Sequence, residues 1–173
     1  MNVKEMPYSE KYANVLDSIK HEEFIQTFIE KHLGQPAVAE FEKICQERVK
    51  PIPEDASHED KYEIAYGNWI WMGSSAFSFI RERMGEEGIK QFVHADVDHL
   101  KRKNASPALF LLRLIRAVSP GSAFTMTAKQ TVYKLQWLSP YSVPELTRQR
   151  AVFSIPKCKI LDFPNSEDMC VIG

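Results

Sequence analysis

The sequence has few cysteines and almost no net charge, and each scarcity excludes a class of protein. Three cysteines are an odd and small number, which argues against a disulfide framework and indicates a reducing compartment. We therefore expect a cytoplasmic protein. The formal net charge is −1, without the basic excess that neutralises nucleic-acid phosphates, so we expect no nucleic-acid partner.

Long apolar runs and fixed-spacing catalytic motifs are also missing. The most apolar stretch, PALFLLRLIRAV at 107–118, is too short to span a bilayer, so we expect no membrane partner. The N-terminal MNVKEMPYSEKY carries charges where a signal peptide needs an apolar stretch. We find no nucleophile elbow, phosphate-binding glycine loop, dinucleotide fingerprint or His-Glu-x-x-His pair.

What is present fits one globular domain, residues 1–173. Hydrophobic residues make up 44% and charged residues 26%, which is typical of a folded chain. Helical spacing of apolar residues predicts one helix over 9–33, which ends at Gly34. A second helix starts at Pro36. Its predicted inward residues are Val38, Phe41, Ile44, Cys45 and Val49.

The third predicted helix is the most unusual segment. Ser57 and Asp60 form a near capping-box pattern at its start, and Gly85 closes it. It is apolar on more than one face, which is typical of a central helix contacted from several sides. A shorter amphipathic helix follows over 86–104. Ser106-Pro107 then begins another helix, which ends at 119–121.

The last third changes to a strand pattern. SAFTMTAKQTVYKLQWL at 122–138 is rich in β-branched and aromatic residues in near alternation, which predicts a strand. A loop containing Pro140 and Pro144 leads to a second strand over 148–163, broken at Pro156. The fold class is therefore α+β. Helices over about 9–118 pack on a small antiparallel sheet from strands over about 122–163.

Aromatic residues of the third helix are the candidate ligand site. Tyr66, Trp69, Trp71 and Phe77 lie beside several small residues, and such a set suits an apolar pocket for a small organic ligand between this helix and the sheet. The alternative is that these rings are core residues. Two arginines on an apolar segment, Arg113 and Arg116, are the candidates to bind an anion, unless both reach the surface.

Histidines and cysteines supply a second, metal-binding hypothesis. His94 and His99 are five residues apart, so they need outside ligands, and the alternative is a solvated helix face. Cys158 and Cys170 lack a short Cys-x-x-Cys spacing and also need further ligands. Zinc or iron is the cofactor that such a site would take.

The order of elements and three short motifs carry a resemblance. The motifs are FIRERMGEEGIKQF at the end of the third helix, SPGSAF after the next helices and SEDMC near the C-terminus. Together they resemble the 4-vinyl reductase-type and L-2-amino-thiazoline-4-carboxylic acid hydrolase-like domains. The resemblance implies an α+β domain in which Cys158 and Cys170 bind a metal or line a ligand site.

Three functions stay open from the sequence. The first is a small-molecule-binding domain that acts as a sensor or carrier. The second is a hydrolase of a small cyclic or amino-acid-like substrate, assisted by a metal. The third is a protein-interaction module in which apolar helix stripes pair across a two-fold axis to form a homodimer.

Overall fold

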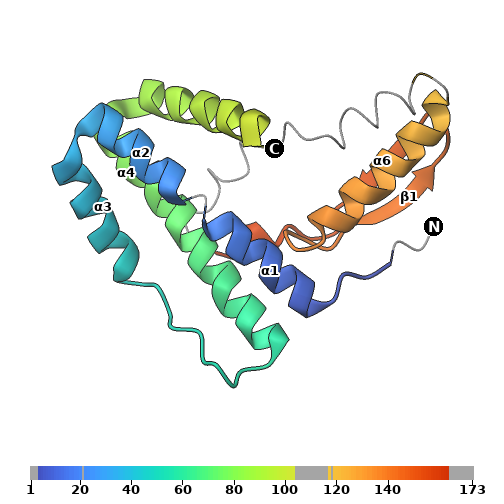
Figure 1. Ribbon diagram of the computed structural model, residues 1–173, viewed down its shortest axis with the longest axis horizontal. Helices are drawn as coiled ribbons and strands as arrows, with labels where there is room; N and C mark the ends of the chain where they lie inside the picture. The colour runs from blue at the N-terminus through green and yellow to red at the C-terminus, as the bar shows by residue number, and fades with distance from the viewer. Residues whose placement is uncertain (1–3, 21, 104–116, 118, 164–173) are drawn as a thin grey trace. The chain divides into compact units, whose positions relative to one another are not determined.

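The computed structural model describes residues 4–20, 22–103, 117 and 119–163. These residues are mostly helical and include a two-stranded antiparallel sheet, which confirms the α+β class (Figure 1). The chain divides into two compact units. The helical unit comprises the described residues of 8–100 and from 160 onward. The hairpin unit comprises those of 4–7 and 101–159. The expectation of one domain stays a prediction.

The predicted first helix is two helices. Helix α1 covers Tyr8–Ile19 and α2 covers Glu22–Leu33, so the single helix over 9–33 was wrong. The apolar spacing continues across the break. In one straight helix the buried Val15 would lie about 80° from Ile25 and about 40° from Ile29, within a single apolar stripe. Spacing alone therefore does not show where α1 ends.

Helix α3 covers Gln35–Gln46 and confirms the second predicted helix. Gly34 takes a φ of 84°, which only glycine adopts readily, and its carbonyl accepts the N–H of Ala37 at 3.1 Å. Proline occupies the first helical turn, where its missing N–H costs nothing. The inward prediction for Val49 was wrong. That residue lies beyond the helix and is 49% exposed.

Helix α4 covers His58–Lys103 and contains a break at Gly85, where φ is 65° and ψ is −166°. It therefore consists of two helical segments, as the sequence predicted. Ser57 begins the first segment, since its Oγ accepts the Asp60 N–H at 3.1 Å and donates to the Asp60 carboxylate at 2.6 Å. The contacts of α4 come from several sides, which confirms the central position expected for this helix.

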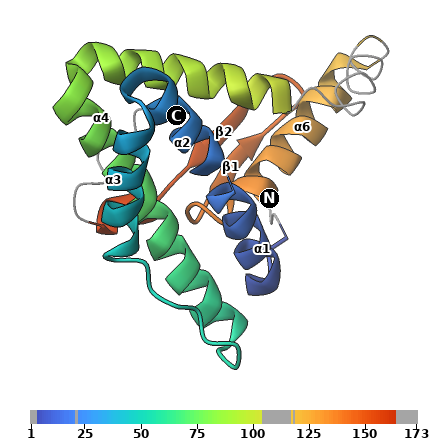
Figure 2. The same ribbon diagram turned by 60° about the vertical axis from the view of Figure 1, so that its left-hand side comes forward.

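The core of the helical unit joins α2, α3 and both segments of α4, which Figures 1 and 2 show side by side. Phe28, Phe41, Phe79 and Phe92 are among its largest members, each 4% exposed or less. The following residues complete the buried cluster: Ile25, Ile29, Ala37, Val38, Cys45, Met72, Ala76, Phe77, Ile80 and Ile89. Cys45 is buried here as a small apolar residue, as its position on the α3 stripe predicted.

The segment predicted as the first strand is a helix. Helix α6 covers Pro120–Leu135, so the strand over 122–138 was wrong. Ser119 and Pro120 begin α6, with proline in the first turn. The helix predicted from Ser106-Pro107 lies almost entirely outside the described residues. The apparent alternation does not describe burial. Phe124 and Met126 are 39% and 43% exposed, whereas Ala128 is buried.

The hairpin that follows consists of β1, Ser142–Leu146, and β2, Ala151–Ser154. Strand β1 lies in the segment predicted as a loop because of its prolines. Pro144 is tolerated because the register shifts between Ser142 and Glu145, at an irregularity where a ladder N–H is not needed. Strand β2 confirms part of the second predicted strand and ends before Pro156.

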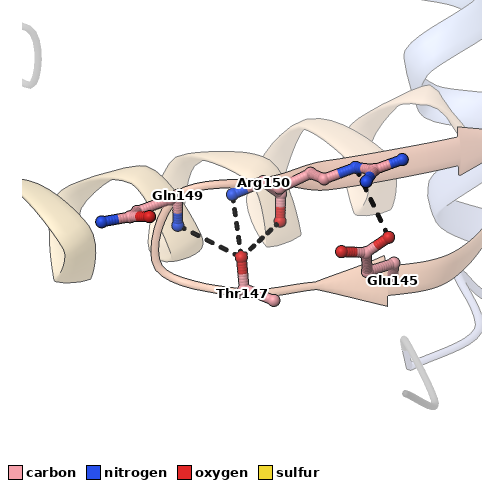
Figure 3. A network of polar contacts seen from close by, with 4 residues as sticks. All are labelled: Glu145, Thr147, Gln149 and Arg150. Carbon is pink, nitrogen blue, oxygen red and sulfur yellow. Dashed lines mark hydrogen bonds and ion pairs between the residues drawn. The ribbon is translucent and has the colours of Figure 1, made fainter.

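The turn of the hairpin is held by one threonine (Figure 3). Thr147 Oγ1 accepts the N–H groups of Gln149 at 3.3 Å and Arg150 at 2.9 Å, and it donates to the Arg150 carbonyl at 3.2 Å. The Arg150 guanidinium lies 3.5 Å from the Glu145 carboxylate across the strands. A short 3₁₀ helix, η1, follows at Lys159–Asp162.

Candidate functional site

Two polar atoms in the first segment of α4 are buried without a hydrogen-bond partner. They are Nε1 of Trp71 and Oγ of Ser75. In the described part of the chain, no other buried side-chain nitrogen or oxygen lacks a hydrogen-bond partner. Residues four apart lie one above the other on a helix, so both groups belong to one face. A buried donor without a partner costs about 1–3 kcal/mol, and for that reason such groups are rare in folded proteins.

The adjacent Ser74 provides a comparison, because its hydroxyl has a hydrogen-bond partner. Ser74 and Ser75 are both buried, at 3% and 6% exposure. Ser74 Oγ donates to the Trp71 carbonyl at 3.1 Å, which is the usual local bond for a serine within a helix. Ser75 has carbonyls three and four residues earlier, at Met72 and Trp71, but its Oγ forms no such bond. The Ser75 hydroxyl is thus available to a partner from outside the helix.

The segment after α3 is fastened to this face of α4. Asn68 accepts the Lys50 N–H at 3.0 Å with Oδ1 and donates to the Lys50 carbonyl at 2.9 Å with Nδ2. Two residues earlier, the Arg48 guanidinium lies over the Trp71 ring, with Cζ 4.1 Å from the ring centroid. Arg48, Trp71 and Ser75 therefore form one group, which we name the Trp71 site.

A second stacked arginine in the same unit provides a contrast. Arg83 lies over the Phe79 ring at 3.9 Å and also pairs with the Glu40 carboxylate at 2.6 Å. Arg48 is stacked in the same way, but within the described residues no carboxylate lies within 4.0 Å of its guanidinium. The Trp71 site thus presents hydrogen-bond donors and one positive charge.

The other predicted pocket residues lie in aromatic contacts. Tyr66 is fully buried, and its ring centroid lies 5.6 Å from those of Tyr62 and Trp69. Phe77 is buried and meets Phe92 edge to face at 5.4 Å. The structure thus brings Tyr66 and Trp69 together. Phe77 instead lies with Phe24, Phe28 and Phe92 in a group of rings that we name the phenylalanine cluster. The prediction of a pocket between this helix and the sheet stays a prediction.

A tyrosine row extends from α1 to α4. Tyr8 contacts Tyr62 at 5.7 Å, and Tyr62 contacts Tyr66. Burial raises the pKa of Tyr62 far above that of a free phenol, and the nearby Glu63 and Tyr8 add to this shift. The Tyr62 hydroxyl therefore remains neutral at physiological pH, and this row behaves as packed core.

The predicted metal ligands are distributed over the chain. His94 is exposed, whereas the half-buried His99 packs its ring 4.9 Å from that of Phe24. Cys158 is a half-buried free thiol in the hairpin unit. There, burial raises the pKa of Tyr141, and the nearby Cys158 adds to the shift. Arg113, Arg116 and Cys170 lie outside the described residues. Within those residues, no three His, Cys, Asp or Glu side chains gather as metal ligands.

Comparison with known proteins gave no match. No protein-family model, curated protein or solved structure is significantly similar to the chain. The resemblance to the vinyl reductase-type and thiazoline carboxylate hydrolase-like domains therefore stays a prediction. In the part of the chain that the structure describes, none of the helices combines the length and apolar character needed to cross a bilayer.

Sequence reasoning found one residue of the Trp71 site and missed two. Trp71 was predicted because tryptophan stood beside small residues in a helix. Ser75 was not predicted, because serines among small residues in a helix more often indicate close helix packing. Arg48 gave no signal, because its position over Trp71 depends on how Asn68 holds the chain at Lys50.

Proposed function

We propose that the helical unit binds a small organic molecule at the Trp71 site. The observation that carries the proposal is the pair of buried, unpartnered polar atoms, Trp71 Nε1 and Ser75 Oγ. A ligand that accepts hydrogen bonds from both would remove a cost of about 1–3 kcal/mol for each group. Apolar surroundings with a few convergent polar groups are the usual composition of small-molecule sites.

Binding fits the chemistry of the site better than catalysis does. An indole N–H only donates, a guanidinium only donates, and a serine hydroxyl needs a neighbouring base to act as a nucleophile. The three groups of the Trp71 site are thus suited to hold and orient a ligand, in a sensor or carrier. The hydrolase and the homodimer stay predictions.

Calorimetric titration with two simple probes tests the proposal. Benzoate and benzamide share an apolar ring and differ in the acceptor group, so each matches the donors of the site. We expect saturable binding of at least one probe below about 10 mM, which corresponds to a few kcal/mol of binding free energy. Trp71→Phe keeps a ring but removes the N–H, and Ser75→Ala removes the hydroxyl. Each change should weaken binding about tenfold.

Two neighbouring substitutions are the matched controls. Trp69→Phe makes the same chemical change two residues away, beside Tyr66. Ser74→Ala removes a hydroxyl that already has a partner. Both variants should bind the probes like the unmodified protein. The proposal fails if neither probe binds, or if the Trp71 and Trp69 variants lose affinity equally.

A further inference from the structure

The donors of the Trp71 site identify the chemical class of its ligand. Trp71 Nε1 can only donate, and the Ser75 hydroxyl is buried without a partner. Arg48 adds a charged guanidinium over the indole ring. Two donors from one face of α4, with a cation over the indole ring, favour an acceptor group with more than one lone pair and a negative charge.

The stacked arrangement leaves the guanidinium available for such a group. An arginine that uses its flat face against an aromatic ring keeps its N–H groups for hydrogen bonds in its own plane. Arg83 shows this in the same unit, since it stacks on Phe79 and holds the Glu40 carboxylate at 2.6 Å. The Arg48 guanidinium also lies over a ring, with Cζ 4.1 Å from the Trp71 centroid, and no carboxylate of the described residues lies within 4.0 Å of it.

We propose that the ligand carries a monocarboxylate whose oxygens accept hydrogen bonds from Arg48, Trp71 and Ser75. This inference rests on the proposed function and specifies it. Among oxyanions, a carboxylate fits better than a phosphate because the site supplies one cation, which balances one negative charge. A dianion would bring an unbalanced charge beside a half-buried indole.

Charge selectivity tests the inference separately from the proposed function. We expect benzoate to bind about tenfold more tightly than benzamide at low salt, because its hydrogen bonds are charge-assisted. Arg48→Gln should remove this preference, because it should weaken benzoate binding about tenfold more than benzamide binding. Arg48 is exposed, so this variant should fold. Arg83→Gln is the matched control, since it removes the other stacked arginine and should keep the preference.

The outcomes separate the carboxylate inference from the proposed function. If benzamide binds as tightly as benzoate, the carboxylate inference fails and the proposed function stands. If neither probe binds, both fail. Inorganic phosphate is the third probe, and phosphate that competes with benzoate at equal concentration would overturn the choice of a monocarboxylate. Loss of selectivity in Arg83→Gln, as in Arg48→Gln, would show that a general charge effect, rather than the Trp71 site, sets the preference.

Discussion

Two aromatic residues of α4, Phe92 and Trp71, lie in opposite surroundings. Phe92, in the second segment, meets Phe28 and Phe77 edge to face at 5.1 and 5.4 Å and lies 5.8 Å from Phe24. Trp71, in the first segment, has an arginine over its ring and a buried N–H without a partner among the described residues. The phenylalanine cluster is complete as it stands, whereas the Trp71 site is completed by a partner group.

In a helix that is apolar on several faces, buried polar atoms without a partner distinguish a candidate binding site from residues that only pack. The rings around Phe92 gain stability from burial and edge-to-face contact and leave no polar atom unsatisfied. The Trp71 site instead keeps polar groups buried at a cost in stability. Substitutions around Phe92 should therefore lower stability, whereas substitutions in the Trp71 site should mainly weaken binding.

The largest expected effect is on the phenylalanine cluster. Phe92→Ala removes a ring that is 4% exposed and should lower the free energy of unfolding by about 3–5 kcal/mol. Chemical denaturation measures this loss. The matched control is Phe153→Ala, because Phe153 on β2 is 47% exposed and its removal should change stability by less than about 0.5 kcal/mol. Equal losses in the two variants would contradict the assignment of the core.

The next largest expected effect is at Gly85, where α4 is broken. Replacing this glycine by alanine should lower stability, whereas the same change at the control position, Gly67, should raise it. Gly85→Ala places a side chain at a φ of 65°, and should destabilise the protein by about 1–3 kcal/mol although no atom crowds the new Cβ. Gly67→Ala lies within the helix, where the new Cβ would contact Phe163 at an ordinary 3.5 Å. It should stabilise by about 0.5–1 kcal/mol. Thermal unfolding that shifted both variants in the same direction would refute this account of α4.

The smallest effect is the sharpest comparison, because it involves adjacent serines. Ser74→Ala deletes a hydrogen bond to the Trp71 carbonyl and should cost about 1 kcal/mol. Ser75→Ala deletes a buried hydroxyl without a partner and should leave stability unchanged or raise it by up to about 1 kcal/mol. Urea denaturation of the two variants side by side measures the difference. A greater loss for the Ser75 variant would mean that its hydroxyl is already satisfied.

Local signals in the sequence predicted the helices well where a terminal residue has a specific backbone role. Gly34, Gly85 and the Ser57–Asp60 pair mark helix ends as expected. The break between α1 and α2 was not predicted because the apolar spacing continues across it and gives no sign of a helix end. The strand prediction for the α6 segment was wrong because β-branched residues in short alternation also occur in helices. Tertiary contacts then determine whether such a segment forms a helix or a strand.

The candidate site was predictable only in part. A tryptophan among small residues indicates that a ligand or another backbone can approach the helix closely, and this pattern predicted Trp71. The sequence does not show which of two adjacent serines donates to a carbonyl of the preceding turn, since both occupy buried positions in the same turn. The same holds for Arg48, which reaches Trp71 because Asn68 fastens the chain at Lys50.

The central claim is that the indole N–H of Trp71 is a buried donor that a ligand acceptor completes. The most direct test is the ¹H–¹⁵N correlation spectrum of the indole groups during a benzoate titration. The chain has three tryptophans, so Trp71→Phe assigns the Trp71 signal by its disappearance. The account predicts that this signal moves downfield and saturates with benzoate while the signals of Trp69 and Trp137 stay in place. A Trp71 signal that remains unmoved when the protein is saturated with benzoate would contradict it.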